Sequence, residues 1–184
     1  MKLPIEAKRV FKGVLFDIYQ WEQELFDGNT STYEVAVRKA SVQVIAVYNG
    51  KIILANEEQP GTKRFNGFLG GWIEEGEEPL EAAKREMQEE ACLISDNIIH
   101  WKTTQMSMKV KWDTHYYIAK NCRKEGEQRL DAGGEKLEPF EVNFDEFVEV
   151  ALRPDFRNKE FSCFLLRTLR NKEELKKLKK LIFS

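Results

Sequence analysis

The sequence has no excess of charge of one sign and few cysteines. Lysine and arginine total 29 and aspartate and glutamate total 31, for a formal charge of −2. This balance argues against a nucleic-acid partner. The cysteines, Cys92, Cys122 and Cys163, are scattered and form no CxxC pair, which argues against a zinc site or a disulfide framework. We therefore expect a reducing, cytoplasmic location.

Long apolar runs are also missing. The N-terminus, MKLPIEAKRV, lacks the apolar stretch of a signal peptide, and no segment reaches the length of a membrane span. We therefore expect no membrane partner. At 184 residues, with 42% hydrophobic and 33% charged residues, the chain resembles an ordinary globular protein of one domain, with room for a small appendage.

Hydrophobic patterning predicts strands first, one helix between strands, and helices at the end. The pairs Asp27-Gly28 and Asn49-Gly50 are typical of tight hairpin turns, and Pro79 suits the first turn of a helix. This order indicates a mixed α/β layer protein. We expect strands within residues 10–26, 33–38, 42–48, 51–55, 68–73, 98–106, 112–119 and 137–142, and helices over 80–91, 144–152, 156–169 and 172–182.

The stretch GGWIEEGEEPLEAAKREMQEEACL, residues 70–93, carries eight glutamates against one lysine and one arginine. On a helical wheel, Leu80, Ala83, Met87 and Ala91 form one apolar stripe, the face that must meet a sheet. The glutamates that matter most are those beside this stripe, because a helix packed on a sheet is half covered there.

Glu86 and Glu90 are neighbours on that flank, four residues apart, with Glu89 further round on the same side. Like charges at this spacing destabilise a helix by a few tenths of a kcal/mol. The alternative is a solvated acidic face, which is the ordinary explanation of a glutamate-rich helix. Because the repulsion lies where solvent is half excluded, we favour a site for a hard cation such as Mg²⁺.

The same stretch resembles the Nudix hydrolase box. Gly71 is followed by Glu77, then by Arg85-Glu86-Met87, Glu89-Glu90 and the apolar Leu93, so that every charged position of the box is filled at the correct spacing. One position departs, since the family has glycine where this chain has Cys92. A residue with a Cβ enters the left-handed turn at a cost of about 1 kcal/mol, so we expect altered helix termination and intact chemistry.

The resemblance implies a fold, an activity and roles for the box residues. The fold is a Nudix-type α/β/α sandwich with a mixed sheet, and the activity is hydrolysis of a nucleoside diphosphate linked to another moiety. The implied cofactor is Mg²⁺, with Mn²⁺ as a substitute, which neutralises the phosphate oxygens and lowers the pKa of the attacking water. The implied metal ligands are Glu86, Glu90, Glu89 (also a candidate base) and the Gly70 carbonyl, and Arg85 pairs with Glu77.

Residues 19–47 and EEQPG (Glu57 to Gly61) extend the resemblance to the ADP-ribose pyrophosphatase branch. This branch implies a homodimer, formed through an antiparallel N-terminal segment. We therefore divide the chain into residues 1–40 (a dimerisation element), 41–152 (the Nudix domain) and 153–184 (C-terminal helices that pack on the domain). Two features depart from the branch: its proline after the box is absent, and its arginine after EQ is replaced by Gly61.

Candidate residues outside the box are less constrained by spacing. The branch often has a glutamate base on a late loop, and in DAGGEKLEPFE (residues 131–141) we choose Glu135, with Glu138 second. A solvated loop acid is an equally good explanation. Substrate contacts are expected at Arg64, Phe65, Lys111 and Trp112, although aromatic residues in strands more often belong to the core.

Two alternatives stay open. One is a Nudix-fold module that binds a nucleotide without turnover, suggested by Cys92 and the missing arginine. The other concerns the basic tail EELKKLKKLIF, which suits RNA or an anionic surface. Its short apolar stripe, Leu175, Leu178 and Leu181-Ile182, more simply packs on the domain, and we favour packing.

Overall fold

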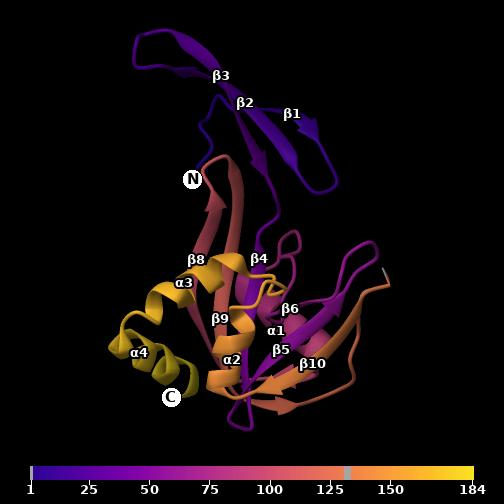
Figure 1. Ribbon diagram of the computed structural model, residues 1–184. Coiled ribbons are helices and arrows are strands. Elements are labelled where there is room, and N and C mark those ends of the chain that lie inside the picture. Colours follow the sequence, from indigo (N-terminus) through magenta and orange to yellow (C-terminus); the bar gives the residue numbers. More distant parts are fainter. Residues whose placement is uncertain (1, 131–133) are drawn as a thin grey trace.

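The computed structural model describes residues 2–130 and 134–184, which contain ten strands and four helices (Figure 1). The strands are β1 (Lys8–Lys12), β2 (Asp17–Glu24), β3 (Thr30–Val37), β4 (Ser41–Tyr48), β5 (Lys51–Glu58), β6 (Phe65–Gly67), β7 (Leu93–Ile94), β8 (Asn97–Ser107), β9 (Val110–Lys124) and β10 (Lys136–Val142). The helices are α1 (Pro79–Ala91), α2 (Phe144–Ala151), α3 (Lys159–Thr168) and α4 (Lys172–Phe183).

The sheet is mixed and is built around β4. Its main path runs β1-β2-β3-β9-β4-β5-β10, and β4 lies parallel to β9 and antiparallel to β5. The β4–β5 hairpin turns at Asn49 and Gly50, which both have positive φ, as the Asn-Gly pair predicts. Residues 41–47 of β4 are all buried, because successive side chains enter cores on opposite faces of the sheet.

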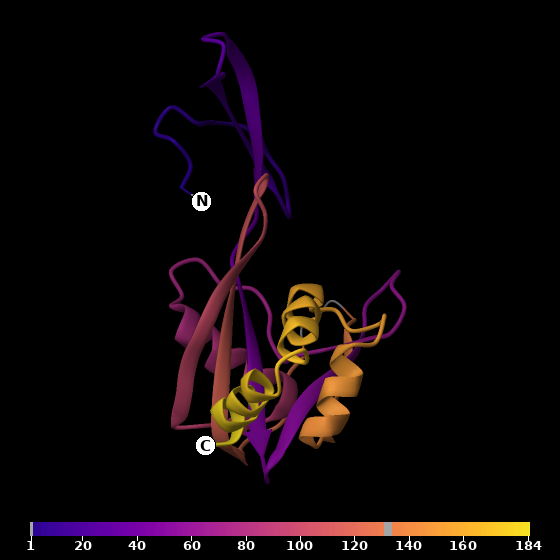
Figure 2. The same cartoon turned by 60° about the vertical axis from the view of Figure 1, so that its left-hand side comes forward.

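Two hydrophobic cores cover the two faces of this sheet. Helices lie on both sides of it (Figure 2), so the predicted α/β sandwich is confirmed. Helix α1 packs on one face through Ala83, Met87 and Ala91. Helices α2, α3 and α4 pack on the other face, where Phe68 meets the rings of several neighbours edge-on, Phe161 among them at 4.8 Å. The described helices include none with both the length and the apolar character needed to cross a membrane.

Strands β1, β2 and β3 form an arm that projects from the body of the molecule (Figure 1). The long hairpin of β8 and β9 reaches this arm, and its tip pairs with the end of β3 at Ala36–Val110 and Val37–Lys111. The residues that follow β3 lead directly into β4, so the base of the arm lies next to the centre of the sheet.

Several predicted elements have different boundaries. The stretch expected as strand within residues 10–26 forms two strands, β1 and β2, which pair with each other. The strand expected over residues 68–73 lies earlier, as β6, because Gly70 has a φ of 146° and Leu69 and Trp72 make only isolated bridges to β4. Helix α3 begins at Lys159 rather than at residue 156, because residues 155–157 pair with β6. The tail packs as favoured, with Leu178 and Ile182 buried in the core.

Candidate active site

The acidic cluster, defined as Glu86, Glu89 and Glu90, lies on α1 beside the stripe that packs on the sheet. Pro79 occupies the first turn of this helix, and the buried stripe fixes its rotation. As a result Glu90 is only 8% exposed and the Glu86 side chain 13%, whereas that of Glu89 is 38% exposed. The cluster is therefore largely withdrawn from solvent, as the position of the stripe predicts.

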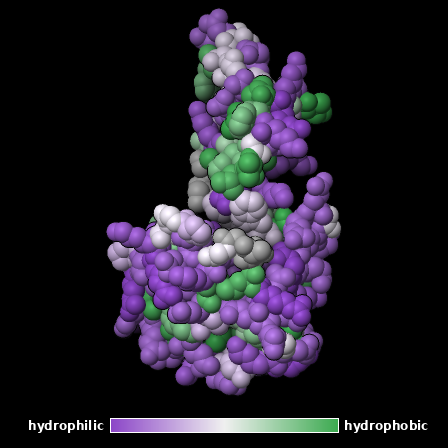
Figure 3. Space-filling model, turned by 90° about the vertical axis from the view of Figure 1, so that its right-hand side faces the viewer, coloured by the Kyte–Doolittle hydropathy of each residue, from purple (hydrophilic) through white to green (hydrophobic). Residues whose placement is uncertain are grey.

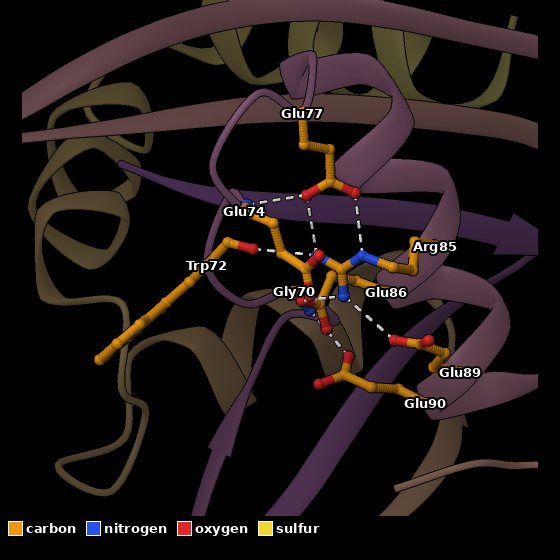
Figure 4. Close-up of polar contacts among 8 residues, drawn as sticks. All are labelled: Gly70, Trp72, Glu74, Glu77, Arg85, Glu86, Glu89 and Glu90. Atoms are coloured by element: carbon orange, nitrogen blue, oxygen red, sulfur yellow. Dashed lines mark hydrogen bonds and ion pairs between the residues drawn. The ribbon is translucent and has the colours of Figure 1, made fainter. Parts of the chain in front are cut away.

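Arg85 restrains the cluster from within the same helix (Figure 4). Its Nε donates to Glu77 at 2.9 Å and its Nη1 donates to Glu86 at 2.9 Å and to Glu89 at 3.1 Å. The hydrogen bonds to Glu77 are the main cause of a raised pKa for Arg85, and they lower the pKa of Glu77. Nη2 donates to the Trp72 carbonyl at 3.0 Å, so Arg85 joins the loop before α1 to the cluster.

Glu90 is held by the loop rather than by Arg85. The Gly70 N–H donates to its carboxylate at 2.8 Å. Burial, followed by the nearby charge of Glu86, raises the pKa of Glu90 well above its ordinary value. Burial and a neighbouring negative charge both disfavour an ionised carboxylate, and a cation bound beside Glu90 would have the opposite effect.

Gly70 and Gly71 pack so closely against their neighbours that neither position has room for a side chain. A Cβ on Gly71 would lie 2.3 Å from a carboxylate oxygen of Glu86, and one on Gly70 would lie 2.2 Å from the Val42 carbonyl oxygen. Gly71 therefore lets the backbone approach Glu86 closely, and Gly70 lets it pass directly against β4.

The carboxylates of the acidic cluster suit a hard cation, and the Gly70 carbonyl stays a predicted further oxygen ligand. Within the described part of the chain, no three acidic, histidine or cysteine side chains form a preformed metal-binding group. The Arg85 guanidinium contacts Glu86 and Glu89 from one side. Binding a cation there requires these carboxylates to turn toward it.

The end of α1 corrects one expectation. Cys92 takes the left-handed conformation, with φ 55° and ψ 35°, and its N–H bonds to the carbonyl of Gln88 at 2.9 Å. Helix termination is therefore not altered by the missing glycine, because the cysteine accepts the strained conformation that glycine would adopt freely.

The acidic cluster opens into a pocket of about 610 Å³. Its lining comes from α1 and the loop before it, from β4, β5 and β9, and from residues between β1 and β2, between β3 and β4, and near the starts of β10 and α3. Residues outside the box that line it are Leu15, Arg38, Lys39, Ser41, Gln43, Glu57, Gln59, Trp112, Thr114, Glu135, Arg157, Asn158 and Glu160.

Glu135, the glutamate chosen as base, lines this pocket next to Glu57. Burial, then a hydrogen bond to Glu57 and the charge of that residue, raises the pKa of Glu135 to about 7. A carboxyl with such a pKa exchanges a proton near neutral pH. Glu138, the second choice, is absent from the lining and pairs with Arg64, and residues 131–133 of the same predicted loop lie outside the described residues.

The four predicted substrate contacts are dispersed. Trp112 lines the pocket, and its Nε1 donates to Ser41 at 3.1 Å. Arg64 points elsewhere, donating to Glu58 at 3.3 Å and to Glu138 at 3.1 Å, and this placement does not support a substrate contact. Phe65 and Lys111 are also absent from the pocket lining.

The pocket also contains residues that sequence reasoning missed. Glu57 shares the face of β5 with Ile53 and Ala55, so strict alternation along this strand predicts a buried carboxylate there. Arg38 and Arg157 carried no comparable signal. Arg38 directly follows β3 and Arg157 lies just before α3, so only the tertiary fold brings them into one pocket.

A family model described as the NUDIX domain matches residues 37–164, which is more than half of the chain. The chain belongs to the Nudix family. This confirms the resemblance seen in the box, and with it the prediction of a Nudix hydrolase similar to ADP-ribose pyrophosphatase.

Relatives of this Nudix protein have several names. ADP-ribose pyrophosphatase of Bacillus subtilis is 28% identical over 149 residues, covering 79% of this chain and 75% of the relative. The methanol dehydrogenase activator of Bacillus methanolicus is 27% identical over 157 residues, covering 79% and 80%. A crystal structure of an ADP compounds hydrolase has the same fold, with a TM-score of 0.72, 23% identity, and coverage of 89% and 90%.

Proposed function

We propose that this Nudix protein is a magnesium-dependent hydrolase of nucleoside diphosphates linked to a sugar-type moiety, the class that includes ADP-ribose. The observation that carries the proposal is the acidic cluster, with Glu90 buried, Gly71 packed directly against Glu86 and Glu135 lining the same pocket. The names of the relatives in Bacillus subtilis and among the solved structures support the substrate class.

The reaction adds water across the diphosphate bridge. One bridging P–O bond breaks, an oxygen of water becomes bonded to that phosphorus, and the products are a nucleoside monophosphate and a phosphorylated second product. When bound, magnesium supplies charge neutralisation of the bridge oxygens and a lower pKa of the attacking water. Mn²⁺ is the expected substitute.

The protein's own residues orient these groups and move the proton. The Gly70 N–H and Arg85 fix the carboxylates of the acidic cluster, and Glu77 fixes Arg85. In this proposal Glu135, which lines the pocket and has a pKa raised to about 7, accepts the proton of the attacking water. Trp112 lines the pocket as a surface on which a base or sugar stacks.

A substrate panel tests the proposal directly. The protein is incubated with ADP-ribose and nucleoside diphosphate sugars, with Mg²⁺, with Mn²⁺ and with EDTA, and the monophosphates are quantified. We expect monophosphate release that depends on the metal. Folded protein that releases none from any member of the panel would contradict the proposal.

The alternative is a nucleotide-binding module without turnover. The one observation that favours it is the similarity to a protein named an activator. A module of this kind binds nucleotide as tightly after Glu90→Gln as before and shows no metal-dependent release. The intact charges of the box favour the enzyme.

We also propose that the chain forms a homodimer through its arm. The arm and the hairpin tip beside it carry exposed apolar side chains: Val10, Phe11, Val14, Leu15, Leu25, Phe26 and Met108. Figure 3 displays green apolar surface gathered over the arm, whereas the body below is mostly polar. Monomers rarely leave such a patch uncovered.

Light scattering on the double variant Phe11→Ser, Val14→Ser tests the dimer. We expect the wild type to have twice the mass of the chain and the variant to be monomeric. Leu166→Ser, which changes an apolar residue of α3 that is exposed to a similar extent as Phe11, is the control and should leave the mass unchanged. The division of the chain at residues 40 and 152 stays a prediction, which limited proteolysis tests. The cytoplasmic location also stays a prediction, which cell fractionation tests.

A further inference from the structure

The pocket holds a second group of like charges besides the acidic cluster. This guanidinium pair consists of Arg38 and Arg157, and both residues line the pocket. Burial, followed by the charge of Arg157, lowers the pKa of Arg38. Two cations held near each other in a partly buried pocket repel, just as the carboxylates of the cluster do. An anion would relieve this repulsion.

Arg38 is fixed by aromatic rings rather than by carboxylates. Its guanidinium carbon lies 4.2 Å from the ring centre of Trp112, 5.1 Å from that of Trp72 and 5.7 Å from that of Phe16. Its Nε is buried and has no hydrogen-bond acceptor among the described residues. The rings stabilise the positive charge without neutralising it.

The backbone on both sides of Arg157 is anchored. The Asn66 N–H donates to the Asp155 carbonyl at 3.0 Å, and the Arg157 N–H donates to the Asn66 carbonyl at 2.7 Å. Phe156 is fully buried on one side, and Asn158 is 6% exposed on the other. This segment therefore presents the Arg157 side chain to the pocket from a fixed backbone.

Among the described residues, the guanidinium of Arg157 donates hydrogen bonds only through Nη1, to Glu57. Its Nη1 lies 3.2 Å from a carboxylate oxygen of Glu57, and its side chain is 44% exposed whereas that of Glu57 is 7% exposed. Glu57 also accepts a hydrogen bond from Gln59, so its charge does not depend on Arg157 alone. A guanidinium has five N–H donors in a planar fork that matches a phosphate group.

We propose that Arg157, with Arg38 beside it, binds a phosphate group of the substrate. The two arginines belong to a part of the pocket wall that the acidic cluster does not form. The inference rests on the proposed function, because it assumes a diphosphate ligand. It assigns the phosphate-binding role to Arg157, from the C-terminal part of the chain, in place of Arg64.

Calorimetry with an uncleavable ligand tests this role. The probe is α,β-methylene ADP-ribose in the presence of Mg²⁺. We expect Arg157→Gln to weaken its binding by about 10- to 100-fold, since hydrogen bonds to a charged group are lost, and Arg157→Lys to weaken it less. Arg64→Gln is the matched control, an arginine near the same end of the sheet that pairs with carboxylates outside the pocket, and should bind as the wild type does.

A purely structural role for Arg157 predicts a different pattern. If Arg157 only neutralises Glu57, then Glu57→Gln combined with Arg157→Gln should bind the probe as tightly as Glu57→Gln alone. We expect the double variant to remain weaker by the factor seen for Arg157→Gln. Thermal melts establish whether each variant is folded. If Arg157→Gln does not fold, Arg157→Lys, which keeps the positive charge, replaces it as the test variant.

The outcomes separate this inference from the proposed function. Hydrolysis by the wild type together with unchanged probe binding by Arg157→Gln overturns the role of Arg157 and leaves the hydrolase intact. Probe binding that depends on Arg157, without hydrolysis, supports the role and overturns the hydrolase. A wild-type protein that neither binds the probe nor hydrolyses any substrate overturns both.

Discussion

The acidic cluster and the guanidinium pair share one pocket but are built differently. The cluster comes from one turn and one helix, and Arg85, whose three guanidinium nitrogens are all engaged, restrains it. The pair comes from segments more than a hundred residues apart and is restrained by aromatic rings and by Glu57. In both, repulsion between like charges is maintained by rigid surroundings. The difference indicates that the cluster depends on α1 and its loop, whereas the pair depends on the whole fold.

The largest effect is expected from Glu90→Gln, which breaks the acidic cluster. Bound metal supplies several kcal/mol of transition-state stabilisation, so turnover should fall by about three orders of magnitude. The metal-free variant should melt no lower than the wild type, because burying an ionised carboxylate is unfavourable. Glu81→Gln, on the exposed side of α1, is the control. Turnover within tenfold of the wild type would exclude Glu90 as a ligand.

Arg85→Lys should have the next largest effect, because lysine cannot reproduce the planar fork that contacts Glu77 and the cluster. We expect turnover to fall by about 10- to 100-fold, as for other groups that orient metal ligands. The free energy of unfolding should fall by about 2 kcal/mol, measured in urea. Lys84→Met, beside it on the exposed face, should change neither quantity much, and equal losses in both variants would refute a specific role for Arg85.

The raised pKa of Glu135, which lines the same pocket as the acidic cluster and the guanidinium pair, can be tested through the pH dependence of stability. Its pKa is raised to about 7, so between about pH 4.5 and 7 the metal-free folded state binds a proton that the unfolded state has lost. This contribution to stability is complete below the unfolded pKa and disappears as the pH rises through about 7. In EDTA, the melting temperature of the wild type should therefore decline across this range more than that of Glu135→Gln. Parallel curves would mean that Glu135 has an ordinary pKa.

The smallest effect is expected at the end of α1. Cys92→Gly should raise the free energy of unfolding by up to about 1 kcal/mol, because glycine adopts φ 55° without strain. Cys92→Ala keeps the Cβ and should melt as the wild type does. Stabilisation by alanine as well would point to the thiol rather than to the backbone.

The acidic cluster was predictable because its geometry is local. Spacing alone placed Glu86 and Glu90 beside the buried stripe, and the glycine pair and Pro79 marked the loop and the start of the helix. Fold class followed from the order of the elements. The helix end at Cys92 is also a local feature. The sequence indicates the free-energy cost of a left-handed conformation at a residue with a Cβ, but not whether the folded backbone adopts that conformation.

The other side of the pocket was not predictable, because its residues meet only through tertiary contacts. Arg157 fell inside a predicted helix, and the pairing of residues 155–157 with β6 displaces the start of that helix to Lys159. Arg64 resembled a substrate contact by its place after EEQPG, but in the structure it faces Glu58 and Glu138. Residue type and order do not indicate which of two arginines the fold directs inward.

The bond between the amide of Asn158 and Gln43, at 2.8 Å, has a consequence for synthesis on the ribosome. It joins the central strand to a segment that is synthesised 115 residues later. Until that segment emerges, the face of β4 that Phe156 and Phe161 cover stays exposed on the nascent chain. A chain truncated before Phe156 would expose this apolar face permanently. We expect such a fragment to aggregate or to bind chaperones rather than to fold into a smaller enzyme.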